Sequence, residues 1–249
     1  MFTLIGWQQN VNTGGVLTEI DALADQHVRV EDNNIIVPRG LNALLGAYHC
    51  APTATLAQLS SPSLRRTVLL DIAPIDVGTE PASPPGFLNL FYSPIALDED
   101  EALRALVAGG EGAAERKVVL AWLGDGPQAA VQGEFFTIRA TGNTTLTAYA
   151  WTNVALTFTQ TLPAGRYAVV GMRAQSAGCL AARLVFVGGV WRPGCIGADA
   201  ISDISPDLFR GGRLGVWGEF EHTQPPTVDF LSASADTSEV VYLDIAKLS

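Results

Sequence analysis

The sequence predicts an all-β protein made of two consecutive β-sandwiches. Two observations lead to this prediction. Apolar and polar residues alternate with a period of two in several stretches, for example at Leu146, Ala148 and Ala150, and this alternation is typical of strands with one buried face. Turn signals built from glycine, proline and asparagine also recur too often to leave room for the helices of strand–helix–strand units.

One short helix is expected near Asp98–Val107. Four acidic residues at Asp98–Glu101 precede the apolar Leu103, Leu106 and Val107, and a pair of glycines follows. Carboxylates in the first turn of a helix are stabilised by the helix dipole, and glycine commonly ends a helix. The acids therefore indicate a helix start rather than a metal site.

The first half otherwise reads as a series of short strands separated by turns. The runs Leu41–Tyr48 and Leu56–Leu59 fit a strand or a helical turn equally well, and Thr79–Gly86 reads as a proline-rich loop. The predicted strands are Phe2–Ile5, Val16–Ile20, His27–Val30, Ile35–Val37, Val68–Ile72, Phe87–Tyr92 and Val118–Leu123.

The turn-rich segment Gly124–Pro127 is the expected connection between the two domains. It predicts one β-sandwich over residues 1–126 and a second over residues 127–249. Each part is long enough to bury a core of its own.

The second half predicts about eight strands, the number found in a jelly roll, in which two sheets bury alternate residues against each other. The connection Gly188–Gly212 is longer than an ordinary hairpin loop, and such loops often carry contacts or function. The predicted strands are Glu134–Ala140, Thr145–Ala150, Val154–Thr161, Tyr167–Ala174, Leu180–Val187, Leu214–Phe220, Thr227–Leu231 and Val240–Ile245.

Composition restricts the partners that this chain can have. Fifteen basic and 25 acidic residues give a net charge of −10, and Lys117 and Lys247 are the only lysines, so direct nucleic-acid binding is not expected. No run reaches the ~18 continuous apolar residues of a membrane span. The N-terminal MFTLIGWQQNVN has no basic region and no cleavage site, so we expect no secretory signal and synthesis in a cytoplasm.

The cysteines predict neither disulfides nor metal binding. Cys50, Cys179 and Cys195 are odd in number and lack a C-x-x-C spacing, which is unlike a disulfide framework or a zinc site. We interpret them as buried free thiols. No cofactor is predicted.

Two consecutive β domains of similar size, a helix before the last strand of the first domain, and the turn at Leu162–Val170 (LPAGRYAVV) together resemble the double jelly-roll major capsid proteins of tailless bacterial viruses. The resemblance spans the whole chain in architecture. The chain is short for two jelly rolls, so we expect minimal insertions, and a single elaborated sandwich stays an alternative.

The resemblance implies a structural shell protein and no enzymatic activity. Such proteins associate with themselves, usually as trimeric capsomers, and with other virion proteins, in a lineage that often encloses an internal lipid membrane. The implied location is the virion, after synthesis in the host cytoplasm.

A serine hydrolase is the sharpest enzymatic alternative. Ser176 follows a predicted strand as a candidate nucleophile, with Asp199 or Asp203 as the acid and His222 as the base, in the chain order of α/β hydrolases. However, Ala174 replaces the first glycine of the nucleophile elbow, and the alternating helices of that fold are missing from the pattern. We therefore interpret Ser176 as a turn residue.

Metal binding and carbohydrate binding are two further alternatives. Glu219, Glu221 and His222 include metal-ligand types, but neighbours on a strand point to opposite faces, so His222 faces away from the two acids. A carbohydrate-binding β-sandwich would use tryptophans for stacking, although tryptophans in β proteins more often fill cores or interfaces. The chain has five of them: Trp7, Trp122, Trp151, Trp191 and Trp217.

Self-association is expected from the apolar composition. With 48% hydrophobic and 16% charged residues, few strongly hydrated side chains remain to keep faces and strand edges apart. We predict contact points at Trp191 and Pro193, in the long connection, and at Pro225 and Pro226, because aromatic and rigid loop residues provide interface area at low entropic cost.

Overall fold

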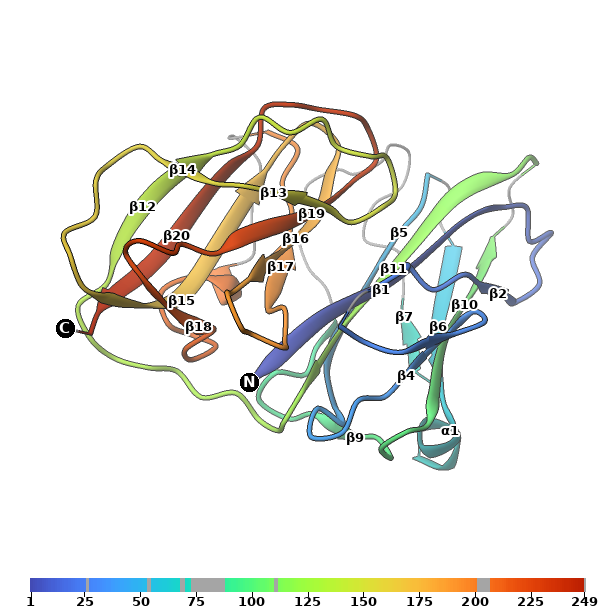
Figure 1. The fold of residues 1–249 in the computed structure, drawn as a ribbon. Helices are drawn as coiled ribbons and strands as arrows, with labels where there is room; N and C mark the ends of the chain where they lie inside the picture. The colour runs from blue at the N-terminus through green and yellow to red at the C-terminus, as the bar shows by residue number, and fades with distance from the viewer. Residues whose placement is uncertain are drawn as a thin grey trace. The chain divides into compact units, whose positions relative to one another are not determined.

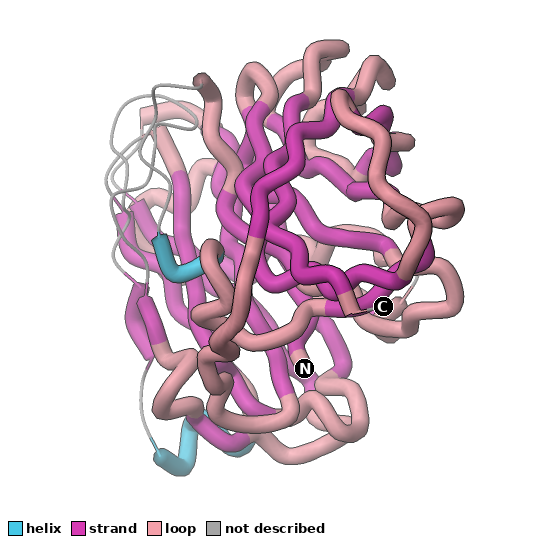
Figure 2. The backbone as a smooth tube through the Cα atoms, turned by 90° about the vertical axis from the view of Figure 1, so that its left-hand side faces the viewer, coloured by secondary structure: helices cyan, strands magenta, loops and turns pink. Residues whose placement is uncertain are grey.

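The computed structural model describes residues 1–25, 27–52, 55–67, 70–72, 88–109, 112–200 and 207–248. Strands dominate these residues, as the magenta segments of Figure 2 show, and the all-β fold class is confirmed. The chain divides into two compact units. The N-terminal unit holds the described residues between Thr3 and Pro127, and the C-terminal unit holds Met1, Phe2 and the described residues from Gln128 onward.

The N-terminal unit contains two sheets (Figure 1). One has the strand order β1-β11-β5-β8, with β9 also paired to β5, and the other has the order β3-β4-β10-β6-β7, with β2 also paired to β10. The strands are β1 (Phe2–Val11), β2 (Thr18–Ile20), β3 (Val30–Glu31), β4 (Asn34–Ile36), β5 (Ala43–Cys50), β6 (Thr55–Ser60), β7 (Leu70–Ile72), β8 (Leu88–Asn89), β9 (Ile95–Ala96), β10 (Ala102–Gly109) and β11 (Glu115–Gly124).

The C-terminal unit also contains two sheets. Their strand orders are β14-β12-β20-β15-β18 and β13-β19-β16-β17. A short 3₁₀ helix, η1 (Asp207–Phe209), precedes β18. The strands are β12 (Phe136–Thr141), β13 (Thr152–Val154), β14 (Thr157–Phe158), β15 (Arg166–Gln175), β16 (Cys179–Val185), β17 (Gly194–Ile196), β18 (Gly218–Glu221), β19 (Thr227–Ser232) and β20 (Val240–Lys247).

The pairing within the C-terminal unit is that of a jelly roll. When the short β14 is left aside, the strands pair from the outside inward: β12 with β20, β13 with β19, β15 with β18, and β16 with β17. Each pair is antiparallel, so the chain forms one long hairpin rolled into two sheets. The N-terminal unit shows the same nesting, with β1 beside β11, β2 and β4 beside β10, β5 beside β8 and β9, and β6 beside β7.

The sequence alternation explains these strands. In β10 every second residue, including Leu103, Ala105 and Val107, is buried, and the residues between them are half-buried. The central strand β5 is buried along its whole length, in agreement with its nearly continuous apolar sequence. None of the helices among the described residues is long and apolar enough to span a bilayer.

The helix expected near Asp98–Val107 is wrong, because Ala102–Gly109 forms β10. Two of the acids before β10 interact elsewhere: Asp100 lies in a turn, and Glu101 binds the first turn of another helix. Asp100 has a positive φ of 61° and binds Arg39. The Glu101 carboxylate accepts a 2.9 Å bond from the backbone N–H of Ser63, in the first turn of the short helix α1 (Pro62–Thr67). The single α-helix of the described chain is therefore α1.

Several details of the second half also differ from expectation. Val154–Thr161 is not one strand, because β13 ends at Val154 and the short β14 covers only Thr157–Phe158. Thr145–Ala150 forms no strand: Ala148 makes an isolated bridge to Ser232, and Tyr149 has a positive φ of 58°, which a strand does not allow. The long connection contains a strand that was not predicted, β17. The proline-rich Thr79–Gly86 lies outside the described residues.

Candidate functional site

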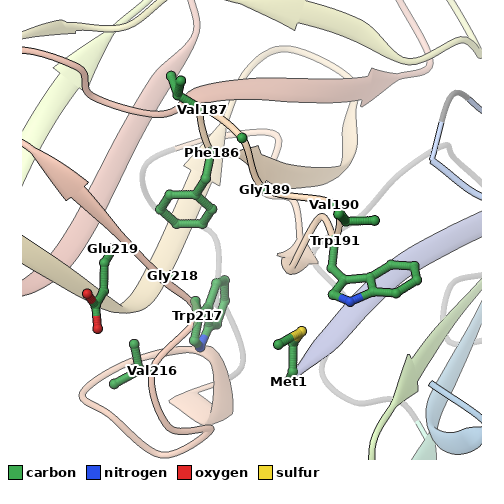
Figure 3. A pocket seen from close by; sticks show the side chains of 11 residues that line it. Met1, Phe186, Val187, Gly189, Val190, Trp191, Val216, Trp217, Gly218 and Glu219 are labelled. Atoms are coloured by element: carbon green, nitrogen blue, oxygen red, sulfur yellow. The ribbon is translucent and has the colours of Figure 1, made fainter. Parts of the chain in front are cut away.

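An apolar groove in the C-terminal unit is the candidate site that the described residues form (Figure 3). The pairing of β15 with β18 brings the chain before β18 close to the segment that follows β16. The groove has a volume of about 540 Å³, within the range of small-molecule sites. It is lined by Met1, by the segment Phe186–Trp191 and by the segment Val216–Glu219.

The walls of the groove expose large apolar side chains. Val187 is 73% exposed, Val190 is 62% exposed, Val216 is 45% exposed and Met1 is 57% exposed. In Figure 3, Val190, Trp191 and Met1 lie on one side of the hollow, opposite Val216 and Glu219. Of the large apolar residues that are exposed in the described chain, these four gather at one place, which is typical of an interaction surface.

The floor of the groove is rigid. Trp217 packs edge-to-face against Phe2, with ring centroids 5.2 Å apart, and against Phe209 at 6.4 Å. The Phe186 ring lies directly over Gly218, where an added Cβ would come within 2.5 Å of the ring. A side chain at that position would therefore have to displace the Phe186 ring. The indole Nε1 of Trp217 is buried and has no hydrogen-bond partner among the described residues.

The rim of the groove follows the open edge of a sheet, because β18 pairs only with β15 among the described strands. The backbone N–H of His222 donates to the Gly165 carbonyl at 3.0 Å. Since antiparallel positions alternate between bonded and non-bonded pairs, Glu219 and Glu221 direct their backbone groups away from β15. The Glu219 carboxylate forms a 2.5 Å ion pair with Arg166 of β15.

The predicted contact residues occupy different environments. Trp191 is half-buried and lines the groove. Pro193 is buried, and its carbonyl accepts a 2.8 Å hydrogen bond from the Leu184 N–H of β16. Pro225 is half-buried and Pro226 is buried. Their role as interface residues stays a prediction, and sequence reasoning missed the valines that supply most of the exposed apolar surface.

The hydrolase arrangement is not formed. Ser176 follows the last residue of β15, and its hydroxyl donates to Asp236 Oδ2 at 2.8 Å. His222 lies beyond the other end of that strand, where its Nδ1 accepts from the Gly165 N–H at 3.3 Å. Ten residues of strand separate the two side chains by about 30 Å. Asp199 lies near Ser176 but accepts a bond from the Gly178 N–H, and Asp203 lies outside the described residues.

No group of three potential metal ligands is present in the described part of the chain. The cysteines there are all free and buried, as predicted. Burial raises the pKa of Cys195 to about 12 and that of Cys179 well above its usual value. These thiols are therefore protonated and unreactive at neutral pH.

A cluster of buried charges holds the sheet that contains β16 and β19. Asp229 accepts bonds from Arg183 at 3.0 Å and from Arg192 at 2.5 Å. The guanidinium of Arg183 also stacks over the Trp151 ring, 4.0 Å from its centroid. Arg183 and Asp229 are almost fully buried, so each charge depends on the other for its solvation.

Glu239 is a second buried carboxylate. One of its oxygens accepts a 3.2 Å bond from the Thr144 N–H, and the other has no partner among the described residues. Burial raises the pKa of Glu239 above its ordinary value, since the charged form is poorly solvated there.

No family model matches the sequence, and no curated protein matches it. Among solved structures, the chain is similar to the crystal structure of the major capsid protein P2 from Bacteriophage PM2. The two share 13% sequence identity, the similarity covers 100% of this chain and 98% of that chain, and the TM-score is 0.28.

Proposed function

We propose that this chain is a structural shell protein, a major capsid protein that associates with copies of itself to build a virion. The observation that carries this proposal is the exposed apolar groove, where Val187, Val190, Val216 and Met1 are left open to solvent. The tandem jelly rolls agree with it, because this fold builds many virus shells. The expected partners are other copies of this chain, arranged as trimeric capsomers, and other virion proteins. An internal lipid membrane is a further candidate.

The groove has the physical character of a surface that another protein covers. Burying an apolar side chain of this size contributes about 1.5–3 kcal/mol. Three exposed valines and a methionine around one hollow therefore supply a substantial part of the free energy of a specific contact. The rigid floor around Trp217 adds to this, because a preorganised surface loses little entropy on binding.

A carbohydrate-binding role is the second candidate, because Trp191 lines the groove and aromatic rings can stack on sugars. The remaining tryptophans do not support it: Trp7, Trp122 and Trp217 are buried, and Trp151 is covered by Arg183. Glu219 provides the only charged side chain of the lining, and it is engaged with Arg166. Sugar sites need several polar groups to fix orientation, so the shell role is preferred.

Sedimentation velocity over a concentration series tests the proposal, with negative-stain microscopy of the same samples. The full chain is expected to shift from subunit to larger assemblies with rising concentration, and closed particles are expected at the upper end. A stable monomer at tens of micromolar, in the presence or absence of salt, would contradict the shell role. Binding of that monomer to a glycan array would favour the carbohydrate-binding role.

A further inference from the structure

A second apolar feature, in the N-terminal unit, has the properties of a partner for the groove. The turn between β1 and β2, residues 12–17, exposes two adjacent apolar side chains, Val16 at 67% and Leu17 at 39%. We call it the β1–β2 tip. Figure 1 shows this segment in blue at the margin of its unit. The remaining large apolar residues that are exposed in the described chain, Tyr92, Phe136 and Leu248, stand singly in the sequence.

The β1–β2 tip is firmly held at its base. The buried Thr13 hydroxyl donates to the carbonyl of Gly109 at 3.1 Å and accepts from the Gly109 N–H at 2.8 Å. Val16 N–H closes the turn onto the Thr13 carbonyl at 3.1 Å. Gly14 and Gly15 have positive φ angles of 58° and 83°, which suit glycine and let the chain reverse sharply. The two apolar side chains thus project from an ordered turn. Because this turn is already ordered, it loses little conformational entropy on binding.

We propose that the β1–β2 tip of one copy inserts into the apolar groove of a second copy. This inference rests on the proposed self-association. The chemistry of the two surfaces matches: residues 12–17 (NTGGVL) carry no charge, so insertion buries no unpaired ion.

Size and symmetry fit the same arrangement. A hollow of about 540 Å³ accommodates two aliphatic side chains with part of the turn. The tip and the groove are different surfaces of one chain, so the contact is heterologous: the copy that inserts its tip keeps a free groove, and the copy that receives it keeps a free tip. Such contacts repeat from copy to copy and form a closed ring or an open filament, depending on the rotation between copies.

Cross-linking between single-cysteine variants tests the proposal on the full chain. One preparation carries Val16→Cys and the other carries Val190→Cys, and a short bismaleimide is added to each alone and to their mixture. Because the natural cysteines are buried and their reactivity is low, the background is expected to be small. A covalent dimer that forms at least tenfold more in the mixture than in either preparation alone supports the insertion. Tyr92→Cys mixed with Val190→Cys is the matched control and is expected to stay at background.

Other outcomes overturn the proposal. Cross-linking of Val190→Cys with itself would mean that groove meets groove, and cross-linking of Val16→Cys with itself would mean that tip meets tip. No cross-link above the control, in samples that sediment as assemblies, would overturn the insertion and leave the shell role standing. Samples that remain monomeric would overturn both. Thermal melting of each variant checks folding, and the pair Val16→Thr and Leu17→Thr, expected to weaken association at least tenfold, provides a measurement without cysteine.

Discussion

The double substitution Val187→Thr and Val190→Thr is expected to weaken self-association about 30-fold or more without unfolding the subunit. Threonine keeps the shape of valine and exchanges one methyl group for a hydroxyl. The two valines are 73% and 62% exposed in the subunit, so the free subunit should change in stability by less than about 0.5 kcal/mol. In a covered groove, each hydroxyl without a partner costs about 1–3 kcal/mol.

The lower bound of that range, about 2 kcal/mol for both sites, corresponds to roughly 30-fold in the association constant. Sedimentation equilibrium over a dilution series measures this constant, and circular dichroism melting checks the fold. Val187→Ile with Val190→Ile is the matched control, because it keeps the groove apolar and should retain association. If the threonine variant associates as tightly as the native chain, the groove is not the contact surface.

Three further predictions follow from buried side chains. Asp229→Ala should cost about 3–5 kcal/mol in urea unfolding, because it leaves Arg183 and Arg192 without their shared carboxylate; a loss below 1 kcal/mol would contradict this. Glu239→Gln should raise the stability relative to the native chain, and this difference should grow as pH rises above about 4.5. The pKa of Glu239 is raised in the folded state, so the folded chain loses this proton less readily than the unfolded chain. A difference in urea midpoint that does not depend on pH would refute the buried charge. Ser176→Ala should cost only about 1 kcal/mol, the worth of its bond to Asp236, and leave any ester hydrolysis by the preparation unchanged.

The period of two in the sequence was sufficient for most strands of the C-terminal unit. Glu134–Ala140 overlaps β12 and Val240–Ile245 lies within β20, and in both strands buried residues alternate with less buried ones, as at Ile138 and Ala140. The same rule failed at Thr145–Ala150. There Leu146 is buried as a strand would bury it, but the positive φ at Tyr149 reverses the chain. Alternation reports burial and not backbone direction, so it cannot distinguish a strand from an extended loop on the core.

The helix near Asp98–Val107 was mispredicted because two periods overlap there. Leu103, Leu106 and Val107 fit helical spacing, whereas Leu103, Ala105 and Val107 fit a strand. The middle residue of the strand pattern, Ala105, has a small side chain and is therefore only a weak apolar signal. The acids fit the first turn of that helix, but Glu101 accepts a bond from the N–H of Ser63 in α1, 38 residues away in sequence. Such a long-range contact has no local signal.

The groove could not be predicted from the sequence either, because it too is formed by contacts between distant parts of the chain. Trp191 is conspicuous as an aromatic residue in a long connection, whereas Val187 and Val216 lie at the ends of apolar runs, a position typical of core residues. Their exposure depends on where the strands end and on which strand lies at the edge of the sheet. That information is contained in the pairing of β15 with β18 and in the termination of β16 at Val185.

The rolled hairpin leaves β18 at the edge of its sheet, and an open edge normally invites indiscriminate pairing. Here β18 itself carries exposed charges, whereas the chain just before β18 is apolar. Glu219 and Glu221 are exposed along β18, and their charges oppose the addition of an arbitrary strand. The chain leading into β18 instead borders the apolar groove, with Val216 and Trp217 in its lining. A charged edge beside an apolar hollow disfavours the addition of a flat strand and leaves room for a compact apolar projection, so the surface that we propose for assembly would also limit what can assemble with it.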